Sequence, residues 1–172
     1  MCLFATTKRP YTAKRDLTCY KAIRKSNYSR NGRLKYEVGR KYHTEMLKDY
    51  NDTFADGVVG VYGDQSGFPV GAGFHSTKTI QRLLQSCSNY ANSSKIAVFI
   101  IPKGSKYYLD DTGLVVSDTI IYKEDVFSST TLERVSNTVY RGIKFRVRDK
   151  NGRLHHVNPE ETDMNKFKTW ER

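Results

Sequence analysis

The sequence predicts an α+β fold, a strand-dominated single domain with a mixed or antiparallel sheet, one main helix and a C-terminal β-hairpin. An uninterrupted apolar run at 96–101, preceded by Lys95, stops at Pro102, which is typical of a strand buried on both faces. Apolar residues recur with helical spacing in 77–91. Two Asn-Gly dipeptides, at 31–32 and 151–152, interrupt alternating segments, as hairpin turns do. The 172 residues fit one domain, 1–172, in which 126–172 would be a C-terminal hairpin and tail extension.

The N-terminal third is predicted to be mostly strand. Residues 17–24 read as a short strand, and 28–38 alternate polar and aromatic residues around the first Asn-Gly. Gly39 ends that hairpin, and residues 40–50 could begin a short helix or a further strand. Residues 51–73 hold six glycines and are predicted to be a long loop, with one strand at 58–62 as an option.

The main helix is predicted over 77–91, with Ser76 or Thr77 as its N-cap. Its apolar face would consist of Ile80, Leu83, Leu84 and Cys87. Ile96–Ile101 would then form the central strand of the sheet. Further strands are expected at 106–109, 114–116 and 118–122.

The C-terminal part is predicted to be a linker followed by the second hairpin. Residues 126–131 read as the linker, and the hairpin strands are expected at 139–148 and 154–157. The tail from Pro159 could form a helix, because its apolar residues recur every three positions: Met164, Phe167 and Trp170.

The formal net charge of +11 is distributed unevenly along the chain. Residues 1–50 carry 13 Lys/Arg against 4 Asp/Glu, and residues 141–172 carry nine against five. If both ends meet in space, they form one basic face, and we expect Arg24, Lys25, Arg146 and Arg148 on it. Such a face attracts nucleic acid, a nucleotide or an acidic protein; otherwise it only keeps the chain soluble.

Three cysteines with no CxxC pair argue against a disulfide framework and a zinc knuckle, and we expect no metal site. Cys19 and Cys87 have apolar neighbours and are predicted to be core thiols. No run approaches the about 20 apolar residues of a membrane span, and the first residues do not resemble a signal peptide. We therefore expect a cytoplasmic protein that is not secreted and has no membrane partner.

The strongest local candidate for a ligand site is the glycine-rich turn before the predicted helix. Backbone N–H groups at a helix start suit a phosphate, and nearby cations would add charge. The expected ligand-binding residues are Gly73, His75, Ser76, Lys78 and Arg82. The alternative is structural, with glycines forming the turn and a hydroxyl capping the helix.

Two other patterns indicate chemistry or binding. His75-Ser76-Thr77 spells the HxT motif of two-histidine phosphodiesterases, but the second motif that this chemistry needs is missing. Six tyrosines alternate with Lys and Arg, which is how single-stranded nucleic acid is held, or else they fill a modest core: Tyr28, Tyr36, Tyr42, Tyr107, Tyr108 and Tyr122.

Three segments together resemble small uncharacterised proteins of tailed bacteriophages and prophages. They are the YEVGxxY segment at 36–42, GFH at 73–75, and IPKGxxYY at 101–108 with the SDxII that follows at 117–121. The resemblance covers roughly residues 17–125. It implies an accessory protein in the cytoplasm of a host bacterial cell, one that counters a host defence.

The order of elements is also similar to the mono-ADP-ribosyltransferase fold. That resemblance would match Arg24 to the strand-one arginine, Ser76 and Thr77 to the Ser/Thr step, and Asp118 or Glu124 to the catalytic acid. It implies NAD as cofactor; otherwise we expect none. Asp118 stands where these enzymes carry a glutamate, so an inactive relative fits the pattern better.

The function hypothesis that follows is binding rather than turnover. The partner would be a polyanionic ligand, that is a nucleotide, a nucleic acid or an acidic host protein. The alternatives are an ADP-ribosyltransferase-like enzyme and a virion structural or accessory protein.

Overall fold

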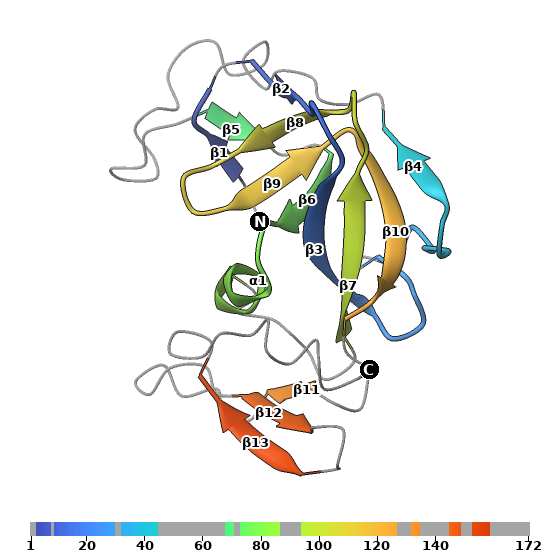
Figure 1. Ribbon diagram of the computed structural model, residues 1–172, viewed down its shortest axis with the longest axis vertical. Helices are drawn as coiled ribbons and strands as arrows, with labels where there is room; N and C mark the ends of the chain where they lie inside the picture. The colour runs from blue at the N-terminus through green and yellow to red at the C-terminus, as the bar shows by residue number, and fades with distance from the viewer. Residues whose placement is uncertain are drawn as a thin grey trace.

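The computed structural model describes residues 3–7, 9–29, 32–44, 68–70, 73–86, 94–126, 132–134, 145–148 and 153–158. An eight-stranded sheet forms its centre (Figure 1). Every pairing described within this sheet is antiparallel. Its strands, in spatial order, are β2 (Tyr11–Thr12), β8 (Lys106–Leu109), β9 (Leu114–Ser117), β6 (Phe74–Thr77), β3 (Leu17–Arg24), β7 (Ser94–Ile101), β10 (Thr119–Asp125) and β4 (Lys41–His43).

Two smaller sheets accompany the main one. β1 (Leu3–Ala5) pairs with β5 (Phe68–Val70), and β11 (Leu132–Arg134), β12 (Phe145–Arg148) and β13 (Leu154–Val157) form a three-stranded sheet. The only described helix is α1 (Ile80–Ser86). Within the described residues the protein is therefore dominated by strands, as the sequence predicts.

The strand predicted at Ile96–Ile101 is present as β7, an interior strand that is sixth in the order of eight rather than central. It pairs with β3 over eight residues, from Leu17 opposite Ile101 to Arg24 opposite Ser94, and with β10 on its other side. Ile96, Ala97 and Phe99 are fully buried. An apolar run without alternation is what a strand covered on both faces requires.

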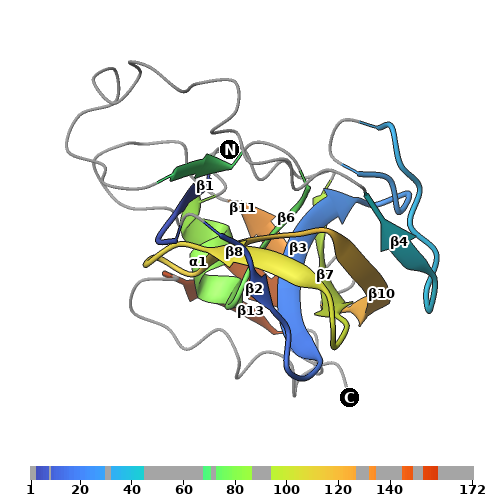
Figure 2. The ribbon, with the colours of Figure 1, turned by 90° about the horizontal axis from the view of Figure 1, so that it is seen from above.

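The main sheet curves strongly. Figures 1 and 2 show β8 and β9 crossing the direction of β3, β7 and β10 at a large angle. The two halves join where β6 meets β3 through a single residue pair, Tyr20 opposite Thr77. The curvature brings side chains from both edges of the sheet into one core: Ala13, Cys19, Ile23, Tyr36, Tyr42, Ala97, Phe99, Ile101, Val115, Ile120 and Tyr122.

A second core lies where β1 and β5 contact β8 and β9. Its members are Leu3, Ala5, Val70, Tyr108, Leu114 and Val116. Tyr108 and Val116 occupy one register position of the β8–β9 pair, so their side chains share a face of the sheet. The short strand β1, which the sequence pattern did not indicate, is thereby attached to the main sheet.

The helix begins at Ile80, so the start predicted at residue 77 is wrong. Thr77 ends β6, where it pairs with Leu114. Thr79 is the N-cap, because its hydroxyl accepts the backbone N–H of Arg82 at 3.1 Å. Ile80, Leu83 and Leu84 are buried as expected. Residues 87–91, Cys87 included, lie outside the described part of the chain.

Several other predictions can be compared with the structure. Residues 17–24, 106–109, 114–117 and 119–125 are strands, and from 40–50 the described residues 41–43 form β4. β12 and β13 pair antiparallel, and β11 adds a third strand. The hairpin turn at 149–152 lies outside the described residues, so the C-terminal hairpin stays a prediction. The same holds for the strand at 58–62 and the tail from Pro159.

Candidate functional site

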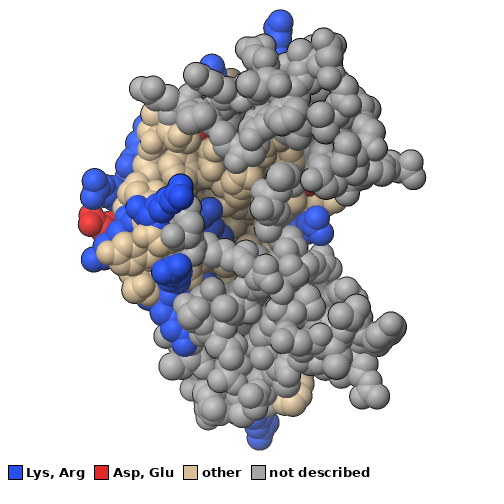
Figure 3. Space-filling model, turned by 180° about the vertical axis from the view of Figure 1, so that it is seen from behind, with Lys and Arg blue, Asp and Glu red and all other residues tan. Residues whose placement is uncertain are grey.

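The most basic part of the described surface is the connection between β3 and β4. Residues 24–42, called the basic segment here, contain seven Lys/Arg and one acid, Glu37. The six cations that the structure describes are all exposed: Arg24, Lys25, Arg33, Lys35, Arg40 and Lys41. Figure 3, which views the molecule from behind, shows Lys and Arg side chains gathered along one flank with little acid among them.

Local hydrogen bonds fold the first half of the segment into a compact reversal. Tyr28 and Lys35 form a single antiparallel bridge, rather than the two strands expected around the Asn-Gly turn. The Ser29 N–H donates to the Leu34 carbonyl at 2.6 Å. Gly32 has φ of 75°, a left-handed conformation that glycine adopts without strain. Asn31 lies outside the described residues, so the turn type stays a prediction.

Tyr36 anchors the segment to the core. Its side chain is 2% exposed and makes edge-on ring contacts with Phe99 at 5.0 Å and Tyr42 at 5.2 Å between centroids. Burial raises the pKa of Tyr36 to about 12, with the neighbouring Tyr42 as the second cause. Its backbone N–H donates to the Asn27 carbonyl at 2.7 Å, which connects the two arms of the reversal.

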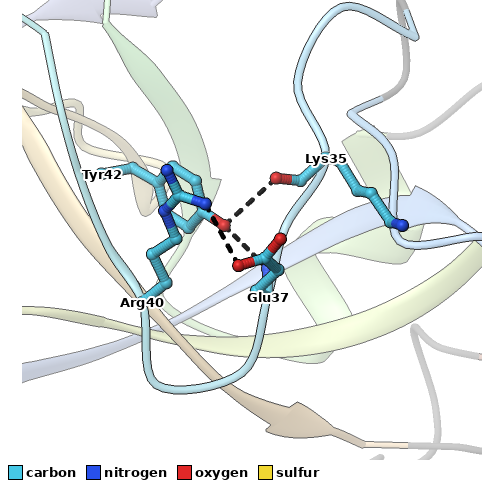
Figure 4. Close-up of polar contacts among 4 residues, drawn as sticks. All are labelled: Lys35, Glu37, Arg40 and Tyr42. Atoms are coloured by element: carbon cyan, nitrogen blue, oxygen red, sulfur yellow. Dashed lines mark hydrogen bonds and ion pairs between the residues drawn. The ribbon is translucent and has the colours of Figure 1, made fainter.

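Tyr42 shapes the second half of the segment (Figure 4). Its hydroxyl accepts the Glu37 N–H at 2.7 Å and donates to the Lys35 carbonyl at 3.1 Å. Arg40 forms an ion pair with Glu37 at 3.1 Å and lies over the Tyr42 ring, 5.6 Å from its centroid. The single acid of the segment is therefore paired within it. The basic segment is a surface fixed by two buried tyrosines.

The exposure of the tyrosines separates core formers from surface residues. Tyr36, Tyr42, Tyr108 and Tyr122 are buried, so for these four the core interpretation is right. Tyr28 is 36% exposed, with the Lys35 ammonium 6.0 Å from its ring centroid. Tyr107 is half-buried. Tyr11, which the sequence reasoning missed, is 39% exposed, and no period-2 pattern in its two-residue strand could have revealed it.

The predicted phosphate turn before the helix is instead strand β6. Adjacent strand residues point to opposite faces, so His75 and Ser76 do not converge. Ser76 is buried and its hydroxyl donates to the Val115 carbonyl at 3.5 Å. The His75 carbonyl accepts the Lys21 ammonium at 2.6 Å. Gly73 precedes β6 with φ of 112°.

The two cations of that predicted site lie near the turn between β8 and β9. The Arg82 guanidinium donates to the Thr112 hydroxyl at 2.8 Å, and the Lys78 backbone N–H donates to the Gly113 carbonyl at 2.9 Å. The Thr79 hydroxyl already accepts the Arg82 N–H. The geometry therefore favours the structural alternative for this stretch.

The strand register places two of the candidate catalytic residues, Arg24 and Asp118, far apart along the sheet. Thr18 pairs with Ile100, and Ile100 pairs with Ile121, so these three residues form one row across the sheet. Arg24 lies six residues from this row in one direction along the strands, and Asp118 lies three residues from it in the other direction. At the strand rise this separates Arg24 and Asp118 by about 30 Å. The Asp118 carboxylate accepts the Lys106 N–H at 3.2 Å. Glu124 is exposed and lies 4.0 Å from Lys123.

A buried charge cluster is a feature that the sequence reasoning missed. Lys95 is 7% exposed, and its ammonium pairs with the Asp125 carboxylate at 2.6 Å. The Tyr122 hydroxyl donates to the other oxygen of the same carboxylate. Burial, followed by the contact with Asp125, raises the pKa of Tyr122 above its ordinary value. The sequence signal for this cluster is the lysine that precedes the apolar run. A lysine in that position usually indicates a solvated strand end.

Of the remaining predicted residues, the structure describes the position of Cys19 but not the side chains of the two arginines in β12. Cys19 is buried, which raises the pKa of its thiol to about 11 and agrees with a core thiol. Arg146 and Arg148 lie in β12, but the positions of their side chains are not described, so a joint basic face of the two chain ends stays a prediction.

Among the described residues, no group of three or more His, Cys, Asp or Glu could hold a metal ion. In the same ranges, α1 is too short to cross a membrane, and no longer apolar helix is found.

Comparisons of the chain with family models, with curated proteins and with solved structures find no match.

Proposed function

We propose that this protein binds single-stranded nucleic acid through the basic segment, residues 24–42. The observation that carries the proposal is the arrangement of charge. Six described cations are exposed on one short connection, and its single acid, Glu37, is paired with Arg40. Phosphates attract such a surface at long range, and displaced counterions add to the affinity.

The aromatic residue beside these cations favours nucleic acid over an acidic protein. Tyr28 is 36% exposed, and Lys35 lies next to its ring. A base that stacks on an exposed tyrosine contributes about 1–3 kcal/mol, and a carboxylate-rich peptide has no comparable group. Tyr36 and Tyr42 hold the segment in place before the ligand arrives, which lowers the entropic cost of binding.

The resemblance to phage and prophage proteins extends the proposal to a role. Under that resemblance the nucleic acid would belong to a bacterial host, and binding it in the cytoplasm would act against a host defence. This extension depends on the resemblance alone.

The test reverses two charges of the segment. Lys25 and Lys35 are suited to it, since both are exposed. Arg24 is less suited, because its guanidinium packs against Gly32 and a reversal would disturb the turn itself. The matched control is Lys78→Glu/Arg153→Glu, which changes the net charge equally at two exposed positions outside the segment.

Binding is measured by fluorescence anisotropy with a labelled 12-nucleotide oligo(dT) and, separately, with polyglutamate. We expect Lys25→Glu/Lys35→Glu to weaken oligo(dT) binding about tenfold or more at low salt, and the control to weaken it much less. Equal losses in both variants would attribute binding to net charge alone. Tighter binding of polyglutamate than of oligo(dT) would favour an acidic protein partner and overturn the proposal.

A further inference from the structure

Two tyrosines form a tilted ring pair at the edge of the main sheet opposite to β4. Tyr11 on β2 and Tyr107 on β8 are register partners, with ring centroids 5.5 Å apart and planes inclined by 32°. Tyr107 packs against the large core, whereas Tyr11 is 39% exposed. We call this pair the tyrosine platform. Its inner ring is supported by the core, and its outer ring is available to a ligand.

Two backbone hydrogen bonds of Ala13, directly after β2, hold the platform to the turn before β8. The Ala13 N–H donates to the Ser105 carbonyl at 2.9 Å, and the Gly104 N–H donates to the Ala13 carbonyl at 2.8 Å. β2 has only two residues, so these bonds fix the strand where its own ladder is too short. A ring held in this way loses little freedom when a ligand stacks on it.

Exposed cations lie next to the platform in the sequence, and one of them, Lys106, precedes Tyr107 in β8 and so points to the opposite face of the sheet. Lys14 and Arg15 follow β2, while Lys103 and Lys106 flank the turn into β8, and all four side chains are exposed. The two acids nearby are directed at backbone groups. Asp16 accepts the Lys103 N–H at 2.8 Å, and Asp118 accepts the Lys106 N–H at 3.2 Å. The residues that flank the platform in the sequence therefore carry a net positive charge.

We infer that the tyrosine platform is a stacking site for a nucleobase of a single-stranded nucleic acid, with Lys14, Arg15 and Lys103 contacting the flanking phosphates. A ring that stacks on Tyr11 continues the arrangement that Tyr11 already makes with Tyr107. The inference depends on the proposed function for its ligand class. It adds a second contact on the other edge of the sheet, since β2 and β4 end the strand order.

The experiment separates base stacking from phosphate attraction. Two probes are compared, a 12-nucleotide oligo(dT) and an abasic deoxyribose-phosphate chain of the same length. The variants are Tyr11→Ala and the control Tyr11→Phe, which keeps the ring. We expect Tyr11→Phe to keep the wild-type preference for the base-bearing probe and Tyr11→Ala to reduce this preference by about 5- to 150-fold, while stacking on Tyr28 maintains the rest of it.

A Tyr11→Ala protein that melts cooperatively and keeps the wild-type ratio of the two affinities would overturn the inference. Proton NMR of the wild type gives a second reading that needs no variant. Stacking predicts upfield shifts of the Tyr11 and Tyr107 ring protons when oligo(dT) is added, and unchanged shifts would contradict it.

The same probes distinguish failure of this inference from failure of the proposed function. Lys25→Glu/Lys35→Glu should weaken both probes alike and leave their ratio unchanged. If that variant binds as the wild type does while Tyr11→Ala loses the base preference, the platform is a binding site and the basic segment is not. If the charge reversals weaken both probes while Tyr11→Ala changes nothing, the reverse is true.

Discussion

The hydroxyl of Tyr42 accepts the backbone N–H of Glu37 at 2.7 Å, and this bond joins β4 to the turn that carries the charges of the basic segment. Tyr42 is 8% exposed, so its ring is fixed by the core while its hydroxyl reaches the surface. The basic segment is thus attached to the core by a buried side chain and not only by its two ends. The first prediction tests this attachment.

Replacing Tyr42 by Phe should loosen the turn at Glu37 without unfolding the protein. The ring stays, but the Glu37 N–H loses its partner, and a hydrogen bond of this kind contributes about 0.5–1.5 kcal/mol. Hydrogen exchange at the Glu37 amide should therefore accelerate by about two- to tenfold. The Tyr36 amide, bonded to the Asn27 carbonyl, is the internal control and should change less. Equal acceleration at both amides would mean that the whole segment depends on Tyr42.

The buried hydroxyl of Tyr36 should limit stability at high pH. Its pKa is raised to about 12 from the ordinary value of 10, because burial disfavours the charged form. The contribution of the neutral Tyr36 hydroxyl to the free energy of unfolding is therefore fully present below about pH 10, the pKa in the unfolded chain. It is lost as the pH rises toward 12. Tyr36→Phe should flatten the decline in the free energy of unfolding in this window, measured by urea titration. Tyr122 contributes in the same direction, so part of the decline should remain.

Removing only Asp125, the partner of Lys95, should lower the free energy of unfolding more than removing both charges. Asp125→Ala leaves a buried ammonium without its carboxylate, and we expect a loss of about 1–3 kcal/mol. The value lies below that of a fully buried pair, because the Asp125 side chain is 36% exposed and water reaches it. Lys95→Met/Asp125→Ala removes the stranded cation and should be more stable than Asp125→Ala alone. Urea denaturation compares the two, and the opposite order would show that Lys95 is solvated without Asp125.

The two candidate acids should not affect binding. Asp118→Ala and Glu124→Ala each remove a carboxylate that lies outside the basic segment, so oligo(dT) affinity should stay within about twofold of the wild type, a change of less than 0.5 kcal/mol. The check for an enzyme is NAD consumption by the wild-type protein. If NAD is consumed and either variant abolishes this while still folding, the protein is an enzyme of the ADP-ribosyltransferase kind.

The parts of the fold that are predictable from sequence are those in which local pattern and tertiary role agree. The run at 96–101 is apolar because β7 is covered on both faces, and Ile80, Leu83 and Leu84 share a buried helix face. The helix start was misplaced because the hydroxyls of Ser76, Thr77 and Thr79 are equivalent caps by sequence. Only the pairing of Thr77 with Leu114 and Tyr20 shows that the strand continues to that point.

Of the candidate site, only the concentration of positive charge is predictable from the sequence. Arg24 and Lys25 are exposed, as expected of a basic face. Which tyrosines line the surface was not predictable, because Tyr28 and Tyr36 have similar neighbours in sequence, and only Tyr36 packs in the core against Phe99 and Tyr42. The pairing of Tyr11 with Tyr107 joins residues from distant parts of the chain, so no local pattern could reveal it.

The most direct test of polyanion binding by the basic segment is the salt dependence of oligo(dT) affinity for the wild type and for Lys25→Glu/Lys35→Glu. For a single strand, each phosphate contact contributes about −0.7 to the slope of log K against log salt concentration. The account predicts a steep negative slope for the wild type and a slope shallower by about 1.4 for the variant, the sum of two lost contacts. A flat wild-type response, or an unchanged slope in the variant, would contradict it.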